Sequence, residues 1–448
     1  MKNYIWIVVL LALGFNVNAQ ESVLSKSEAI TLALDKNFGI KVAKNTVEIA
    51  DNNQGVLNSG FLPSFGGTAN ASFAEDNTTI EFPGQVDENG NPRPDLEINN
   101  AETKRYGAGL NLNYTLFDGL GRTYNYKRLK EQYQLTELQA RQTIQSTILQ
   151  LLSIYFEIAR LSENEFAQKE ALEVTKERII RARYAFEYGQ STQLDVLNAE
   201  VDVTNDSIVL LNTQRLLQNT KRDLSVVLNE DLSLDFEVDT LINFIPMLEL
   251  QAMVDDAFLN NLDILQTERN LAINEYDIKV SKSGYLPVIG LTGSYGWNLN
   301  QNPASAFFPG TNNSNQNFSV GAGLTWNIFD GGNTIVQVRN AKIVYENQEL
   351  LKKQVELEVA RDIRNAMETY KNRLAIYEIQ EKAVVTNLNN FERSREQYQL
   401  GRITSIVFRQ AQINLLAAQT TKNLAKYDAK LAELQLLDLT GQLLNVDF

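Results

Sequence analysis

Two long stretches of the chain, residues 122–188 and 333–400, contain neither glycine nor proline. Of the 24 glycines, ten lie between residues 55 and 121 and nine between residues 284 and 332, and seven of the eight prolines share these windows. Because helices exclude glycine and proline, the chain is predicted to form long helices separated by two non-helical segments. At about 1.5 Å per residue, each long helix would measure about 100 Å, which is too long for a compact domain.

Three short motifs occur twice, in the same order and at similar spacing. They are Ser59–Pro63 with Ser283–Pro287, Phe117–Gly119 with Phe329–Gly331, and Tyr188–Thr192 with Leu400–Thr404. Repetition of this kind predicts two internal copies of one helix–strand–strand–helix–helix unit. The junctions between strands and helices are expected at Pro63, Phe117, Asp118, Gly119, Pro287, Phe329, Asp330 and Gly331.

The first copy is predicted over residues 20–228, and its elements are strands at 64–74 and 106–117, a long helix at 120–188 and a return helix at 192–228. The second copy is predicted over 250–440, with strands at 288–299 and 318–329, a long helix at 333–400 and a return helix at 404–440. Residues 229–249 form a connector and 441–448 a C-terminal tail. One further helix, about 250–282, is expected to stack end to end with the first return helix.

The predicted strands alternate apolar residues with small, uncharged polar residues. In the last strand, Phe318, Val320 and Leu324 alternate with Ser319 and with glycines. Each run has about the 9–11 residues that a tilted strand needs to cross a membrane. A soluble sheet with one face on a core is the alternative, but the small uncharged polar faces favour a wet lumen. Residues 75–104 and 300–316 are expected to be exposed loops.

Four strands are too few to close a barrel. An open sheet in lipid would leave unpaired backbone groups that cost several kcal/mol each, so the chain is expected to assemble. Two copies would give a tight, filled barrel, whereas three would give twelve strands and room for a pore.

The N-terminus has the features of a secretory signal peptide. Lys2 precedes an apolar run from Ile5 to Phe15, and small residues lead to a cleavage site after Ala19, so residues 1–19 are expected to be removed. The chain has no cysteine and no histidine, which argues against disulfides, thiolate metal sites and histidine-dependent catalysis. No catalytic residue, cofactor or metal is predicted. The net charge of −14 argues against nucleic acid as a partner.

The long helices carry apolar residues at spacings of three and four, which predicts coiled-coil-like packing. These positions are Ile144, Ile148, Leu151, Tyr155, Ile158, Val359, Ile363, Ala366, Tyr370 and Leu374. Each helix ends at a glycine, Gly189 or Gly401, that suits a left-handed cap. Thr192 and Thr404 can then cap the return helices, and Thr192 with Asp195 makes a capping box.

These duplicated motifs resemble those of the TolC family of trimeric outer-membrane efflux and secretion channels, over essentially the whole mature chain. The resemblance implies a mainly α fold with β-strands. It also implies a homotrimer with a twelve-stranded barrel in outer-membrane lipid and a coiled-coil helical tunnel across the periplasm of a Gram-negative bacterium. The partners would be a periplasmic adaptor (membrane fusion) protein and an inner-membrane transporter that supplies the energy.

By position, the resemblance implies that the periplasmic entrance and adaptor-docking tips consist of Gly189, Ser191, Thr192, Asp195, Gly401, Arg402, Thr404, Val407 and Gln410. Asp195 would match an acidic residue of the family's closing network. The best-known member has two aspartates where this chain has Val407 and Gln410, and its network arginine falls at Ile403. An apolar or steric constriction near Val407 is therefore our hypothesis.

Two other readings remain open. The chain could serve a type I protein secretion system, which exports polypeptides, or it could be a membrane-anchored coiled-coil scaffold that transports nothing. An enzyme is least consistent with the sequence, because no nucleophile–base pair or phosphate-binding loop is present.

Overall fold

The computed structural model describes residues 23–232, 236–304 and 309–446. The expected signal peptide at 1–19 and the last two residues of the expected tail lie outside this part. The chain divides into two compact units, one comprising residues up to 48, 135–268 and 350 onward, the other comprising 49–134 and 269–349. Within the described ranges, no helix combines the length and the apolar character needed to cross a membrane.

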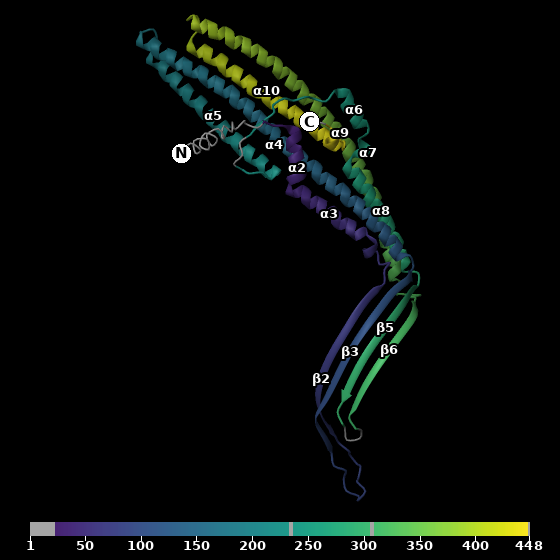
Figure 1. Ribbon diagram of the computed structural model, residues 1–448. Coiled ribbons are helices and arrows are strands. Elements are labelled where there is room, and N and C mark those ends of the chain that lie inside the picture. The colour runs from purple at the N-terminus through teal and green to yellow at the C-terminus, as the bar shows by residue number, and fades with distance from the viewer. Residues whose placement is uncertain (1–22, 233–235, 305–308, 447–448) are drawn as a thin grey trace, which may run out of the picture. The chain divides into compact units, whose positions relative to one another are not determined.

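The unit formed by residues 49–134 and 269–349 contains one antiparallel sheet of four strands, in the order β2-β3-β5-β6 (Figure 1). The strands are β2 (Ser64–Ile80), β3 (Leu96–Asp118), β5 (Val288–Asn302) and β6 (Thr311–Thr325). The pairing of β3 with β5 joins the two sequence copies in one sheet. Across the described residues, β2 and β6 each have one edge without a strand partner.

The hairpins are longer than the sequence predicted. Residues 75–104 and 300–316 were expected as loops, but β2 pairs with β3 as far as Ile80 and Leu96, and β5 pairs with β6 as far as Asn302 and Thr311. Residues 81–95 do lie outside the strands, but both loops were predicted too long, because polar side chains were read as the end of a strand. A backbone ladder continues through Asn, Gln and Thr as readily as through apolar residues, since its hydrogen bonds belong to the main chain.

The last strand ends earlier than predicted. β6 stops at Thr325, which pairs with Val288, whereas residues 326–329 were expected to continue it. Pro287 precedes Val288 and has no N–H to extend the ladder. Trp326 instead donates its indole N–H to the Tyr285 carbonyl oxygen at 3.1 Å.

A register shift also interrupts the alternation of β3. It lies between Thr115 and Phe117, and it places Phe117 opposite Ile289. Phe117 therefore lies on the apolar face beside Ile289, at the place where strict alternation from Tyr114 would put Leu116.

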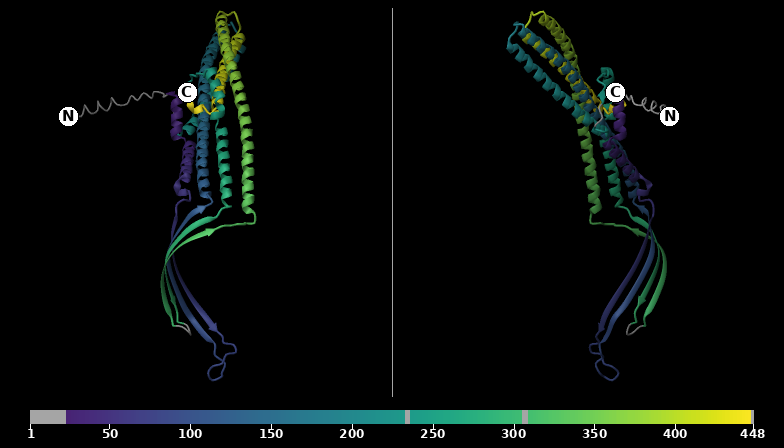
Figure 2. Two further views of the ribbon diagram at one scale, coloured as in Figure 1. Left: turned by 90° about the vertical axis from the view of Figure 1, so that its right-hand side faces the viewer. Right: turned by 60° about the vertical axis from the view of Figure 1, so that its left-hand side comes forward.

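The other unit is built on long helices. They are α4 (Gly121–Glu187) and α9 (Asn333–Gln399), which extend into both units, and the return helices α5 (Gln193–Leu228) and α10 (Ser405–Leu439). In each view α5 runs back beside α4, and α10 beside α9 (Figure 1, Figure 2). The predicted seam is confirmed, because Ile148, Leu151, Tyr155, Ile158, Val359, Ile363 and Tyr370 belong to one buried core.

Short elements complete the helical unit. β1 (Val23–Leu24) pairs in parallel with β4 (Glu237–Val238), and α2 (Lys26–Lys36), the first part of α3 (Phe38–Gln54) and the 3₁₀ turn η2 (Leu443–Asn445) lie in the same unit. A further 3₁₀ turn, η1 (Val56–Asn58), precedes β2.

Tyr155 of α4 links β1 and the connector to the helices. Its hydroxyl donates to the Leu24 carbonyl at 2.7 Å and accepts from the Asp239 N–H at 2.9 Å. Burial raises the pKa of Tyr155 to about 12, so the phenol stays protonated.

The helix predicted at about 250–282 is broken into three. These are α6 (Met247–Asp255), α7 (Ala257–Asn260) and α8 (Leu262–Ser283). Asp256, with ψ 0°, separates α6 from α7. The break between α7 and α8 is at Asn261, which is 3% exposed and has an extended backbone. Its side-chain oxygen accepts from the Asp263 and Ile264 N–H groups at 3.0 and 3.1 Å, so it starts a new helix.

Candidate functional sites at the helix turns and strand junctions

The turn between α4 and α5 has the predicted caps. Gly189 has φ +69°, and its N–H donates to the Phe186 carbonyl at 2.9 Å. Thr192 then caps α5: its hydroxyl accepts from the Asp195 N–H at 3.4 Å, and Asp195 Oδ2 accepts from the Thr192 N–H at 3.1 Å. This reciprocal pair is the capping box, which satisfies backbone donors at the first turn of the helix.

The turn between α9 and α10 is capped on one side only. Gly401 has φ +70°, and the Thr404 hydroxyl accepts from the Val407 N–H at 3.4 Å. Val407 holds the place that Asp195 holds in the first copy, so no carboxylate can return the bond. Gln410, one turn further on, donates to Asn414 Oδ1 at 2.8 Å within the same helix.

The two turns lie at the same end of the helical unit. Arg181 of α4 donates to the Gln399 carbonyl at 2.6 Å, and its guanidinium carbon lies 5.1 Å from the centre of the Tyr398 ring. Asp195 and Arg402 form no ion pair within the described ranges, and Arg402 is exposed. The carboxylate expected in a closing network is thus occupied with capping its own helix.

A charged cluster that the sequence reasoning missed lies above these turns. Arg409 of α10 contacts Asp206 of α5 at 2.6 and 2.8 Å, and it donates to the hydroxyl of the buried Thr175 of α4 at 3.2 Å. Asp202, one turn from Asp206 on α5, binds the buried Arg178 of α4. The cluster therefore ties together three helices from the two sequence copies.

One sequence signal could have revealed this cluster. Asp202 and Asp206 are four residues apart, so both lie on one face of a helix, where two like charges repel each other. Such a pair predicts a cationic partner on a neighbouring helix. Arg409 supplies one, but its long separation in sequence from α5 hides the relationship.

At the first strand–helix junction, Asp118 is the last residue of β3, and its side chain binds the first turn of α4. Its Oδ2 accepts from the Arg122 N–H at 2.9 Å and from Arg122 Nε at 3.1 Å, while Arg122 also donates to the Gly60 carbonyl at 2.8 Å. Gly119 has φ +68°, and a Cβ built there would lie 2.6 Å from the Ser283 carbonyl oxygen. The junctions of the two copies are therefore in close contact, and Gly119 is the residue that permits it.

At the second strand–helix junction an aspartate again caps the long helix, but its hydrogen-bond partners differ. Asp330 Oδ2 accepts from the Thr334 hydroxyl at 2.6 Å and from the Thr334 N–H at 2.8 Å, which caps α9. These bonds stabilise the ionised form and hold the pKa of Asp330 below its ordinary value.

The other predicted junction residues lie close to the strand ends. Pro63 directly precedes β2, Pro287 directly precedes β5, and Phe329 is exposed. Gly331 has φ +72°.

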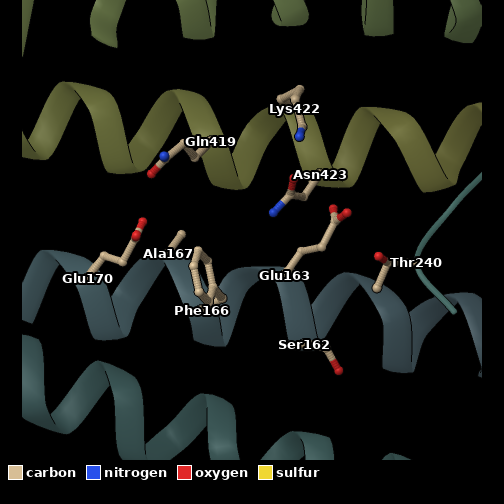
Figure 3. A pocket seen from close by; sticks show the side chains of 9 residues that line it. All are labelled: Ser162, Glu163, Phe166, Ala167, Glu170, Thr240, Gln419, Lys422 and Asn423. Atoms are coloured by element: carbon tan, nitrogen blue, oxygen red, sulfur yellow. The ribbon is translucent and has the colours of Figure 1, made fainter. Parts of the chain in front are cut away.

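A hollow of about 420 Å³ lies where α4 and α10 meet the connector. Figure 3 shows the side chains that line it. Glu163 and Glu170 face it from α4, Lys422 and Asn423 from α10, and Thr240 from the connector. Glu163 is already paired with Lys426 at 2.8 Å, and Lys426 also donates to the Thr240 carbonyl at 2.8 Å. These contacts fasten the connector to the helices. Nowhere in the described ranges do three acidic side chains gather as a metal site would require.

Sequence comparison identifies relatives across nearly the whole chain. The family described as outer membrane efflux protein matches residues 29–230 and 253–442, one stretch in each predicted copy. Outer membrane efflux protein BepC of Brucella suis is 24% identical over 430 residues, which is 93% of this chain and 86% of the relative. Outer membrane protein TolC of Vibrio cholerae is 23% identical over 309 residues, 68% of this chain and 70% of the relative.

Solved structures share the fold. The Campylobacter jejuni CmeC outer membrane channel aligns with a TM-score of 0.73 at 21% identity, covering 93% of this chain and 86% of that one. The outer membrane protein VceC of Vibrio cholerae aligns with a TM-score of 0.71 at 16% identity, covering 93% and 96%. The chain therefore belongs to the outer membrane efflux protein family, the TolC family of channels of the Gram-negative outer membrane, and is a channel component rather than an enzyme.

Proposed function

We propose that three copies of the chain close a barrel of twelve strands in outer-membrane lipid and continue it as a helical tunnel. The observation that carries this proposal is the sheet of four strands with two unpartnered edges, β2 and β6. Its apolar face includes Leu110, Tyr295 and Phe318, which are all exposed in the single chain. Lipid would cover these side chains, and neighbouring chains would satisfy the edge hydrogen bonds that lipid cannot.

The conduit is passive and serves efflux. Energy comes from an inner-membrane transporter, which a periplasmic adaptor connects to the channel. The relatives support this proposal, since BepC is an outer membrane efflux protein and CmeC is an outer membrane channel. Export begins with the signal peptide at residues 1–19, and residues 20–228 and 250–440 are the two repeats that the connector at 229–249 joins.

The helix turns form the entrance and the docking tips. Gly189, Ser191, Thr192 and Asp195 shape one tip of each chain, and Gly401, Arg402, Thr404, Val407 and Gln410 shape the other. Apolar side chains exposed at the turns support this role, with Tyr188 at 78%, Ile406 at 72% and Val407 at 51%. Val407 constricts the entrance by size and apolar character, because the matching positions carry no carboxylate.

Electrical recording in a planar lipid bilayer tests this function. The detergent-purified protein should give discrete, long-lived conductance steps, as a water-filled pore requires. A membrane-anchored scaffold would give no steps, and that result would overturn the proposal. A polypeptide substrate rather than small molecules would be revealed by cells without this protein, which would fail to secrete one large protein while keeping their resistance to toxic compounds.

A further inference from the structure

The register of the sheet assigns every paired residue to one of two faces, because successive side chains alternate. One face is polar, and its rows run across all four strands. The row containing Gly107 also contains Asn70, Asn298 and Asn315. A Cβ built at Gly107 would lie 2.5 Å from Asn70 Oδ1 and 2.9 Å from Asn298 Oδ1, so these amides lean over the glycine on this face.

The next row of the polar face carries a single charge. It consists of Ser72, Arg105, Asn300 and Asn313. Arg105 is exposed, and within the described ranges it makes neither a hydrogen bond nor an ion pair. No other paired residue of this face between the Arg105 row and the Thr115 row is ionisable.

The charges nearest to Arg105 on the same face lie at the two ends of the sheet. Asp76 pairs with Ala101, two rows beyond Arg105 and about 13 Å along the strand. Asp118 lies at the opposite end and is engaged by Arg122. At 0.1 M salt the screening length is about 10 Å, so neither carboxylate neutralises Arg105 effectively.

The opposite face shows the level at which Arg105 lies. On β3 and β5 its rows are apolar or glycine from Ile289 to Leu299, whereas β6 places Gln316 and Ser314 in the last two of these rows. The band on β5 rises about 33 Å along the strand and about 25 Å once tilted, which matches the apolar band of a membrane barrel. The row after Leu299 contains Lys104, whose Nζ lies 2.9 Å from Glu102 Oε2. Arg105 therefore lies at the border of the apolar band, at the end of the sheet remote from the helices.

We infer that Arg105 makes the outer mouth of this channel favour anions, and that carboxylate- or phosphate-bearing solutes pass it more readily than cations of similar size. The inference rests on the proposed trimer, in which the polar face lines the lumen. Three copies of Arg105 would then form a ring of unpaired positive charge at one end of a stretch of lumen that amides, hydroxyls and glycines line as far as the Thr115 row. Rings of charged side chains set ion selectivity in pores.

The test is the reversal potential of single channels in a gradient of KCl. Arg105→Gln should lower the ratio of chloride to potassium permeability about two- to threefold at 0.1 M salt, and the difference should fade at 1 M as screening shortens. Arg105→Lys should keep the wild-type ratio. The matched control is Lys104→Gln, which removes the same charge from the opposite face and should change nothing.

A second variant guards against misfolding. The chain has no cysteine, so Arg105→Cys introduces one reactive thiol. A cationic thiol reagent added to a working channel should raise the permeability ratio, and an anionic reagent should lower it. An Arg105→Gln channel with wild-type selectivity at 0.1 M, or indifference of Arg105→Cys to both reagents, would overturn the inference while leaving the channel function intact. Absence of any conductance in the wild type would instead overturn the proposed function, and this inference with it.

Discussion

Arg409 of α10 binds Asp206 of α5 through two hydrogen bonds, 2.6 Å from Nη2 to Oδ1 and 2.8 Å from Nη1 to Oδ2. Both side chains are largely buried, at 14% and 13% exposure. The pair joins the return helices of the two sequence copies just above the turns. Its strength should therefore decide how tightly the two turns of one chain stay together.

Asp206→Asn should loosen this end of the helical unit. The variant removes the carboxylate that accepts two hydrogen bonds from the largely buried Arg409, which keeps only Asp202 as an ion-pair partner at 3.6 Å. The loss should cost about 1–3 kcal/mol, which corresponds to an increase in local opening of about fivefold to 150-fold. Hydrogen exchange of amides in 193–206 and 405–412 would measure the increase. Glu200→Gln is the control, because its ion pair with Arg183 joins α5 to α4 but is more than 40% exposed on both sides. Equal exchange in the two variants would contradict the role given to Asp206.

Continuity of the long helices is open to a direct test. Ile148 is 1% exposed in the middle of α4, so Ile148→Pro both removes a backbone hydrogen bond and disrupts the core. The cost should be about 3 kcal/mol or more, and the variant should fail to assemble when detergent extracts are sized. Ile148→Val should cost about 0.5–1.5 kcal/mol and still assemble. Normal oligomers of the proline variant would refute the helix as described.

An arginine introduced at three different positions of β6 should have three different effects on insertion into the membrane, depending on the face and the depth of the position. Val320→Arg, on the apolar face in the middle of the band, should cost about 2–4 kcal/mol of insertion free energy. Leu324→Arg, one residue from the end of the strand, should cost only about 0–1 kcal/mol. Ser319→Arg, on the polar face, should be tolerated. Unfolding from lipid vesicles in denaturant would rank the three, and a costlier Ser319 variant would mean that the faces are reversed.

Current through the channel should be insensitive to multivalent cations at the entrance, because Val407 and Gln410 present no carboxylates there. We expect a trivalent cobalt complex added on the entrance side to leave the single-channel current within the noise. The double variant Val407→Asp with Gln410→Asp should become sensitive, since three chains would converge six carboxylates on one constriction. Strong block of the wild-type current would show that acidic side chains at other positions line the entrance.

The sequence predicted the order of elements well, because glycine, proline and side-chain period report local structure directly. The caps at Gly189 and Thr192 followed from the same local chemistry. The ends of the strands could not be predicted, since hairpins of Asn, Gln and Thr look like loops and only the partner strand shows that the ladder continues. The break at Asn261 was missed because an asparagine inside an apolar-periodic helix shows no special pattern.

The clusters formed by distant residues were the hardest to anticipate. Arg409 contacts Asp206 only because two return helices from different copies lie beside α4. A sequence shows which residues are charged, but it does not show which helices are neighbours. Arg105 was equally hidden, because alternation alone cannot show that four strands align their uncharged polar residues in the same rows.

Cross-linking of the open strand edges tests the central claim most directly. Each of three variants carries two cysteines, one at Ala69 of β2 and the other at Phe318, Val320 or Ala322 of β6. A disulfide between them can join only different chains, because β3 and β5 separate β2 from β6 within one chain. Oxidation of the detergent-extracted protein should give a ladder on a denaturing gel that stops at three chains. A protein that stays a monomer in every combination, and remains in solution without detergent, would contradict the account.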